Sequence, residues 1–347
     1  MSNSGTRSVG NWLKGNAKFI LGIVVSLLFL YLAFGGLQFD KVFQEYQRIN
    51  SWYLLLAVGF FFMDVFWVCI RWSYQLHNLN IRKDLKVTFP ITPISVIPSV
   101  AIGYFANNIF PARAGEFFRT FSWCKKTGMG KSVVLATVVV ERIFDGLAMV
   151  TLAVVSSFFI KDKIDGSIAF VIQLGAFIFL GILVFAFLML FFPKPMEKIL
   201  DSLVGFIPHT KIQDSIKHIY HSFIDAFKLL PNFKSVGLLY FFSLMSWLFE
   251  GLVYMITAKA FGFDLPVYAF IFTAAFASLW TLIPSTPGYA GTFDFAVVKA
   301  MGLFAVSASV GAGYTILLHL VLWLPITLIG AFFAWREGVK KIDKVVT

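Results

Sequence analysis

Six long apolar runs limit what this chain can fold into more than any other feature of its sequence. Each run is close to the roughly 20 residues that a helix needs to cross the hydrocarbon core of a bilayer. With 59% hydrophobic and only 14% charged residues, the chain has too few polar side chains to cover a soluble globule. The sequence predicts an all-α polytopic membrane protein, a single domain over residues 1–347 with full spans at 18–37, 51–70, 132–159, 166–192, 235–258 and 307–334.

The formal net charge of +11 comes from Lys and Arg residues that lie mainly in the connections between the apolar runs. In a membrane protein, cations in the connections indicate which side of the membrane each connection lies on, and they attract anionic membrane lipids. Nucleic acid is therefore not expected as a partner. The cation-rich connections are the segment before the first span, 71–90, 111–131, 193–234 and 335–347. Placing them inside the cell predicts a multi-pass protein of the cytoplasmic membrane with both termini cytoplasmic and an uncleaved first span.

Two further apolar stretches contain too many prolines to be uninterrupted helices. Residues 90–111 include four prolines, and residues 266–306 include three. By the charge pattern, each stretch begins and ends on one side of the membrane. This predicts two oppositely oriented re-entrant helical hairpins inside inverted repeats, whose cores are 51–159 and 235–334. The alternative is that both stretches are tilted, kinked helices, which gives eight full spans.

Residues 196–230, between the two halves, predict an amphipathic helix on the cytoplasmic membrane surface. Isoleucine and aromatic residues recur there at helical spacing among charged residues. Asp214, His218 and His221 fall on one face, which suits either a metal ion or a solvated polar surface, and the second interpretation is favoured. The two cysteines indicate neither a disulfide framework nor a metal cluster, and no cofactor is predicted.

An arginine follows the break at the end of the first interrupted stretch. Arg113 comes after Pro111, where a new helix is expected to begin. Its guanidinium and the free N–H groups of that helix start are predicted to bind one phosphate together, with Gly115 letting the anion approach the backbone. Glu116 falls in the first turn of the new helix, where it either complements the helix dipole or binds a cationic headgroup or a proton.

The second interrupted stretch repeats this plan without the arginine. The segments Pro287-Gly288 and Gly291-Thr292 offer similar free N–H groups, those of Gly288, Gly291 and Thr292, and Asp294 falls in the first turn of the next helix with the same two interpretations. Non-helical backbone deep in a membrane needs protein or water beside it. The two broken elements are therefore expected to meet near the midplane and to line a polar cavity.

Ionisable residues inside the apolar runs are further candidates, because a charge in hydrocarbon is costly unless it is paired or wet. Glu141, Arg142 and Asp145 are expected chiefly to pair with one another inside the bundle. The remaining intramembrane candidates are Asp64 and Glu250, each in the span before a hairpin, and Lys299 and His319, cavity or interface residues that receive no role.

Three ordered motifs resemble one known family. They consist of Asn108, Pro111, Arg113, Gly115, Glu116 and Arg119, then Glu141, Arg142 and Asp145, then Pro284, Thr286, Pro287, Gly288, Gly291 and Asp294. Over nearly its whole length the chain is similar to the lysylphosphatidylglycerol synthase transmembrane-domain family, the flippase-like domain also found in the multiple peptide resistance factor. The resemblance implies a protein that moves, or serves enzymes acting on, an anionic or isoprenoid-linked lipid. Tyr289 stands where that family usually has a second glycine, and Asp294 where it usually has glutamate.

The function that these features favour is a lipid flippase, a transporter rather than an enzyme, acting on an anionic phospholipid or a polyprenyl-phosphate-linked lipid. The substrate-binding residues are expected among the motif residues and Glu250. The sequence has no P-loop motif, so transport is expected to be downhill or ion-coupled. An intramembrane enzyme and a scaffold for a separate lipid-modifying synthase stay open as alternatives, and a homodimer is one option for its assembly.

Overall fold

The computed structural model of the chain describes residues 23–35, 39–47, 49–82, 87–110, 113–207, 213–214, 216–217, 233–283 and 286–338. All regular elements within these residues are helices, which confirms the predicted all-α class. An apolar helix, Ile23–Phe34, comes first. It is followed by α2 (Phe39–Tyr46), α3 (Ser51–Arg82), α4 (Pro93–Ile109), α5 (Gly115–Thr127), α6 (Lys131–Ser157), η1 (Lys161–Lys163), α7 (Gly166–Phe191), α8 (Pro193–Gly205), α10 (Phe233–Ala260), α11 (Val267–Trp280), η2 (Pro287–Tyr289), α12 (Thr292–Gly302) and α13 (Ala308–Arg336).

Among the described residues, three helices are long and apolar enough to cross a membrane by length and composition. They are Ser51–Ile81 in α3, Lys234–Ala260 in α10 and Ala308–Arg336 in α13; the first two contain the predicted spans 51–70 and 235–258, and the third covers 307–334 except for residue 307. The helices α6 and α7 occupy two more of the predicted spans. The multi-pass character of the chain is thereby supported, while the total of six full spans stays a prediction.

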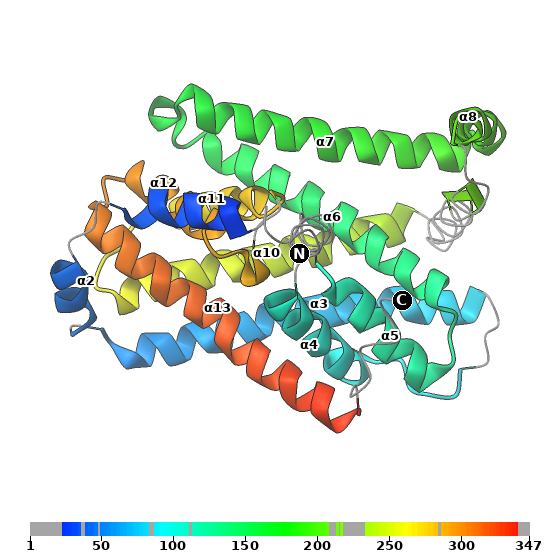
Figure 1. Cartoon of the computed structure of the whole chain (residues 1–347), viewed down its shortest axis with the longest axis horizontal. Helices are drawn as coiled ribbons and strands as arrows, with labels where there is room; N and C mark the ends of the chain where they lie inside the picture. Colours follow the sequence, from blue (N-terminus) through cyan, green and yellow to red (C-terminus); the bar gives the residue numbers. More distant parts are fainter. Residues whose placement is uncertain are drawn as a thin grey trace, which may run out of the picture.

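The longest helices pack around a shared apolar core. Helix α3 lies along α10, α13 lies along α4, and α6 contacts both α10 and α11 (Figure 1). Trp72, Phe270 and Phe276 are fully buried between them. Helix α7 lies at one edge of the molecule and packs mainly on α6 (Figure 1). Because α4 also contacts η2, the two broken helix pairs meet inside the bundle.

The order of a long helix, a broken pair and a second long helix occurs twice. Helices α3, α4, α5 and α6 form the first series, and α10, α11, α12 and α13 form the second. The four helices of the broken pairs have 17, 13, 14 and 11 residues, fewer than the roughly 20 that a perpendicular span needs. This order agrees with the predicted repeats, whose opposite orientation and re-entrance stay predictions.

The boundaries predicted for the first broken pair were wrong. Residues 90–111 hold one helix, α4, rather than both arms of a hairpin. The returning arm is α5, which lies within 111–131, the segment interpreted as a cytoplasmic loop because of its cations. A helical segment that carries several charges was mistaken for a loop, and the break between the two helices lies between Ile109 and Gly115. The second pair, α11 and α12, falls within the predicted 266–306.

Local sequence signals explain where the first pair begins and ends. The Thr92 hydroxyl accepts a hydrogen bond from the Ser95 N–H at 3.2 Å, and the Ser95 hydroxyl accepts one from the Thr92 N–H at 2.9 Å. This reciprocal capping fixes the start of α4. Pro111 disfavours helical backbone at the residue before it, which ends α4. Gly128, with φ of 72°, ends α5 in a left-handed conformation.

Two other sequence expectations concern the segments between the spans. Helix α3 continues to Arg82, so Arg71 lies inside it and is fully buried, although the charge pattern had assigned it to a loop after residue 70. Of the amphipathic segment at 196–230, α8 is described as far as Gly205, and Lys217 pairs with Asp201 at 2.7 Å. His218 and His221 lie outside the described residues.

Candidate functional site

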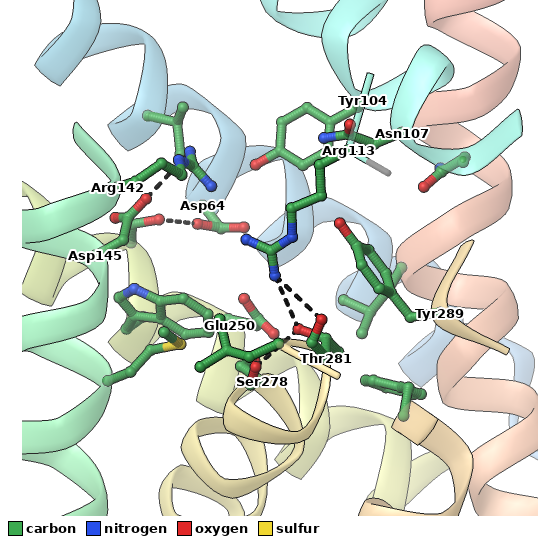
Figure 2. Close-up of a pocket in the computed structure, with 18 of the residues that line it drawn as sticks. Asp64, Tyr104, Asn107, Arg113, Arg142, Asp145, Glu250, Ser278, Thr281 and Tyr289 are labelled. Carbon is green, nitrogen blue, oxygen red and sulfur yellow. Dashed lines mark hydrogen bonds and ion pairs between the residues drawn. The ribbon is translucent and has the colours of Figure 1, made fainter. Parts of the chain in front are cut away.

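A cavity of about 540 Å³ lies where the two broken helix pairs meet. Its walls come from α3, α4, α5, α6, α7, α10, α11, α12, α13 and the connections that follow α4 and α11 (Figure 2). The predicted site residues that line it are Asn108, Arg113, Glu116, Arg142, Asp145, Glu250 and Gly288. The two breaks therefore line one cavity, as expected, and its wall combines charged side chains with a largely apolar surface.

Arg113 lies in the connection between α4 and α5, called here the first tip, and its side chain points into the cavity (Figure 2). Its backbone is left-handed, with φ of 53°, a conformation that non-glycine residues rarely adopt. One guanidinium nitrogen donates to the carbonyl and hydroxyl oxygens of Thr281, both at 3.3 Å, and the guanidinium carbon lies 5.5 Å from the centre of the Tyr289 ring. No carboxylate among the described residues forms an ion pair with it.

Tyr289 is the matching residue in the connection between α11 and α12, called here the second tip. It also has a left-handed backbone, with φ of 61°, and it also lines the cavity. The two strained residues thus contact each other across the cavity through their side chains. Strained backbone of this kind persists only where the surrounding structure enforces it, and it is concentrated at functional sites.

Three arginines and three carboxylates form a continuous network beside the first pair. Arg119 makes two hydrogen bonds to Glu141, at 2.8 and 3.0 Å, and Arg142 contacts Glu141 at 2.7 Å. The remaining contacts of the network are those of Arg71 with Glu141 at 3.1 Å and with Asp145, and those of Arg142 with Asp145 at 3.1 Å and Glu116 at 3.7 Å. The charges of this network balance.

The predicted mutual pairing of Glu141, Arg142 and Asp145 is confirmed but incomplete. Arg71 pairs with both Glu141 and Asp145, Arg119 pairs with Glu141, and both guanidinium groups are buried. Arg119 also lies 3.9 Å from the centre of the Trp72 ring. Glu141 and Arg119 do not line the cavity; they hold the wall behind it, whereas Arg142 and Asp145 reach its surface.

Three charged side chains of the cavity remain outside this network: Arg113, Asp64 and Glu250. Asp64, on α3, accepts a hydrogen bond from the Ser246 hydroxyl. Glu250 lies one turn after Ser246 on α10, and its carboxylate has no hydrogen bond or ion pair among the described residues. Figure 2 shows Asp64 and Glu250 on the far side of the Arg113 guanidinium from α13. Among the described residues, the cavity therefore places one cation without an ion-pair partner, Arg113, opposite two acids.

The acid of the second pair is held differently. Asp294 caps α12 by accepting a hydrogen bond from the Gly291 N–H at 2.8 Å, which confirms the capping interpretation. Its other oxygen lies 2.9 Å from Nδ1 of His319, and Nε2 of His319 lies 2.9 Å from the Gly288 carbonyl oxygen. Asp294 is buried and does not line the cavity, whereas His319 does.

Several predicted site residues pack helices rather than face the cavity. A Cβ on Gly115 would lie 2.0 Å from the Gly103 carbonyl oxygen, and the Gly115 N–H donates to the Asn107 side chain at 2.8 Å. That N–H is not free for an anion, because α4 and α5 already use it. A Cβ on Gly291 would lie 2.4 Å from the Ser26 carbonyl oxygen. The Ser26 hydroxyl also accepts from the Thr286 N–H at 2.8 Å, so this part of the tip rests on the first helix.

Asn108 and Lys299 also make contacts that the sequence did not reveal. Asn108 lines the cavity and donates to the Thr327 hydroxyl of α13 at 2.7 Å. Lys299 is an interface residue: it donates to Ser167 at 2.9 Å and lies 3.5 Å from Asp165. Asp165 caps α7, and the hydrogen bonds from Ser167 and from the Ile168 N–H lower its pKa to about 2.

The sequence did not single out several cavity residues. Tyr104 and Thr281 look like ordinary helix residues, because nothing in their spacing shows that they face a cavity, and Tyr289 was noted only as a departure from the family motif. Asp64 and His319 carried a signal, a polar side chain inside an apolar run, but only the structure gives them partners.

The cavity wall nearest α7 is apolar. Ile178 and Ile182 of α7 line the cavity and are 41% and 38% exposed, and α7 lies at one edge of the molecule (Figure 1). Phe179 and Met149 continue the apolar wall. Within the described part of the chain no group of three or more His, Cys, Asp or Glu side chains is placed to hold a metal ion. Cys69 and Cys124 are both free and buried.

Comparison with known proteins gives relatives that are described only as membrane proteins. A UPF0104 membrane protein of Methanocaldococcus jannaschii is 29% identical over 69% of this chain and 98% of its own length, and a second from that organism is 25% identical over 93% and 95%. A UPF0104 membrane protein of Methanothermobacter thermautotrophicus is 24% identical over 96% of this chain and 99% of its own. No solved structure matches the chain. Residues 19–330 match the model of the family described as the lysylphosphatidylglycerol synthase TM region, and the chain belongs to that family.

Proposed function

We propose that this protein is a lipid flippase of the cytoplasmic membrane that binds a phosphate-bearing headgroup in the cavity between the two tips. The observation that carries the proposal is the Arg113 guanidinium, which faces the cavity without a carboxylate partner among the described residues. Arginine suits phosphate because its planar fork of donors matches two phosphate oxygens at once. The two bonds to Thr281, at 3.3 Å, are long and leave most of its donors available.

The rest of the cavity supports a headgroup with both an anionic and a donor-rich part. Asp64 and Glu250 lie opposite Arg113 and carry the acceptors that a cationic group or sugar hydroxyls would require. The six-residue network beside them is already neutral, so it neither competes for the phosphate nor repels it. A headgroup with a phosphate at one end and hydrogen-bond donors at the other therefore matches Arg113 on one side of the cavity and Asp64 and Glu250 on the other.

The apolar wall supports a substrate that keeps its hydrocarbon tail. Ile178, Phe179 and Ile182 of α7 line the side of the cavity nearest the outer surface. A headgroup bound at Arg113 could leave its acyl or isoprenoid chains along this wall and in the surrounding lipid. A water-soluble substrate would gain nothing from such a wall. The family description, which names a lipid synthase, agrees with a lipid substrate.

The proposal is tested by lipid translocation in proteoliposomes that contain short-chain fluorescent phospholipids or a polyprenyl-phosphate analogue. We expect wild-type protein to speed translocation and Arg113→Ala to slow it at least about tenfold, because a charge-assisted bidentate contact contributes that much or more. Lys161→Ala removes an exposed cation outside the cavity and should leave the rate unchanged. Equal rates for wild-type protein and empty vesicles, with every lipid, would contradict transport.

A further inference from the structure

His319 lies between two oxygen atoms of the second tip, and both positions constrain its protons. Nε2 lies 2.9 Å from the carbonyl oxygen of Gly288, which can only accept, so Nε2 carries a hydrogen. A neutral imidazole has no second N–H, and its Nδ1 then presents a lone pair. That nitrogen lies 2.9 Å from Oδ1 of Asp294.

A proton must therefore lie between Nδ1 of His319 and Oδ1 of Asp294. It belongs either to an imidazolium facing a carboxylate or to a protonated carboxyl donating to a neutral ring, and both forms give the observed contact. The other oxygen of Asp294 accepts from the Gly291 N–H at 2.8 Å in either form. The arrangement thus holds one proton more than a neutral histidine beside an ionised aspartate.

We propose that Asp294 and His319 form a proton-binding site, called here the proton latch, that holds the second tip against α13. Without the shared proton, the neutral ring has one N–H for two acceptors, Oδ1 of Asp294 and the Gly288 carbonyl oxygen. If the hydrogen stays on Nδ1, the bond to Gly288 is lost directly; if it stays on Nε2, lone pairs face each other at Asp294 and the ring turns or moves away, which disrupts the bond to Gly288. Proton loss therefore releases the tip from α13, and proton binding closes it.

The backbone conformation of the second tip favours its release from α13. Gly288 and Tyr289 both have left-handed backbones, with φ of 71° and 61°, and a strained segment relaxes when its tether is removed. Tyr289 carries the ring beside the Arg113 guanidinium. Movement of the tip would therefore change the surroundings of Arg113, so that proton binding at the latch and ligand binding in the cavity influence each other reciprocally.

Among the described residues, Asp294 is the only ion-pair partner of the His319 imidazole. On α12, Lys299 turns away to Ser167 and Asp165, and the Phe293 ring packs on His319 with centroids 4.9 Å apart. The other charged side chains around the cavity are Asp64 on α3, Arg113 and Glu116 at the first tip, Arg142 and Asp145 on α6, and Glu250 on α10. No ion pair joins any of them to the imidazole.

Two variants separate the states of the latch. In Asp294→Asn, the amide oxygen can still accept from Gly291 and the amide nitrogen can donate to Nδ1, so the tip stays closed without a titrating proton. In His319→Ala the tether to Gly288 is absent at every pH. The inference does not rest on lipid transport, because the latch can be measured without a substrate.

The test is backbone hydrogen exchange of residues 286–293 in lipid nanodiscs from about pH 5 to about pH 9, expressed as protection relative to the intrinsic rate at each pH. We expect wild-type protection to fall about tenfold or more as pH rises, because one ordinary and one charge-assisted hydrogen bond are lost. Asp294→Asn should stay protected throughout, and His319→Ala should be unprotected throughout.

The first tip supplies the internal control, since its network of arginines and carboxylates should keep residues 113–120 equally protected over the same range. Constant protection of the second tip in wild type would overturn the proposal. So would a pH dependence in Asp294→Asn that matches wild type. If His319→Ala fails to fold, the comparison of wild type with Asp294→Asn decides the outcome.

Discussion

The two tips share a plan but are held in place by different chemistry. Each has a left-handed residue, Arg113 or Tyr289, and each has an acid in the first turn of the next helix. At the first tip that acid, Glu116, belongs to a network whose cations are all arginines. At the second tip the acid, Asp294, belongs to a pair whose other member is a histidine.

This difference separates a fixed wall of the cavity from an adjustable one. Arginine stays charged at every physiological pH, so the network beside the first tip has one protonation state. Histidine changes charge within that range, so the contacts of the second tip depend on conditions. Arg113, the group proposed to bind phosphate, extends from the fixed side and touches a ring on the adjustable side.

The largest expected effect comes from breaking the network of the first tip. Glu141→Gln leaves Arg71 and Arg119 buried without the carboxylate that joins them, which should lower the free energy of unfolding by about 3–5 kcal/mol. The measurement is thermal or denaturant unfolding in detergent. Glu250→Gln is the matched control, because its carboxylate has no ion pair among the described residues, and we expect a change below about 1 kcal/mol. Equal losses in both variants would show that the network is not what holds this wall.

A smaller loss is expected from overpacking the same region. Gly115→Ala places a methyl group 2.0 Å from the Gly103 carbonyl oxygen, which must separate α4 from α5 at a cost of about 1–3 kcal/mol. Gly59→Ala, on α3 with open space around it, is the control and should not destabilise the protein. The measurement is the unfolding temperature of both variants. An unfolding temperature of Gly115→Ala equal to that of wild type would contradict the close approach of α4 and α5.

Backbone strain at the tips gives a third comparison. Arg113→Gly and Arg113→Ala both remove the guanidinium, but only glycine accepts φ of 53° at little cost. We expect the glycine variant to be more stable than the alanine variant by about 1 kcal/mol, and the same order for Tyr289→Gly and Tyr289→Ala. Denaturant unfolding measures the difference. An alanine variant as stable as the glycine variant would show that the tip relaxes out of the left-handed conformation.

The smallest effect concerns Asp165, which lies outside both tips and caps α7. Hydrogen bonds from Ser167 and Ile168 lower its pKa in the folded state to about 2, below the usual value of about 4. Its stabilising contribution is therefore present above about pH 4 and is lost as pH falls toward 2. Asp165→Asn should show less of this acid-dependent loss of unfolding temperature between about pH 5 and pH 3 than wild type. Identical acid profiles would assign the loss to other carboxylates.

The sequence predicted the parts of this molecule that depend on local pattern. Long apolar runs predicted the helical class, and prolines located both breaks. The sequence placed Arg113 correctly just before a new helix, α5, but not at the connection between the two arms of the first pair. Pairings between distant helices could not be predicted, because no local signal encodes them. Arg71 was missed for this reason: it follows an apolar run and resembles a loop cation, yet its partners lie 70 or more residues away on α6.

The same limit explains why the sequence misjudged the role of Gly115 and assigned no role to His319. Gly115 resembles an anion-binding glycine in sequence, but only the packing of α4 on α5 shows that its N–H is already used. His319 is an isolated histidine in an apolar run, and its two acceptors come from a turn and a helix in the preceding segment. Tertiary contacts decide both cases.

The central claim, that Arg113 binds the phosphate of a lipid headgroup, is tested most directly by lipid binding to the purified protein. The measurement compares the affinity of wild type, Arg113→Ala and Lys161→Ala for a phospholipid and for a diacylglycerol with the same chains. We predict that wild type and Lys161→Ala prefer the phospholipid, and that Arg113→Ala loses about tenfold or more of its affinity for the phospholipid while its diacylglycerol binding is unchanged. Phospholipid binding that is equally tight in Arg113→Ala and wild type would contradict the claim.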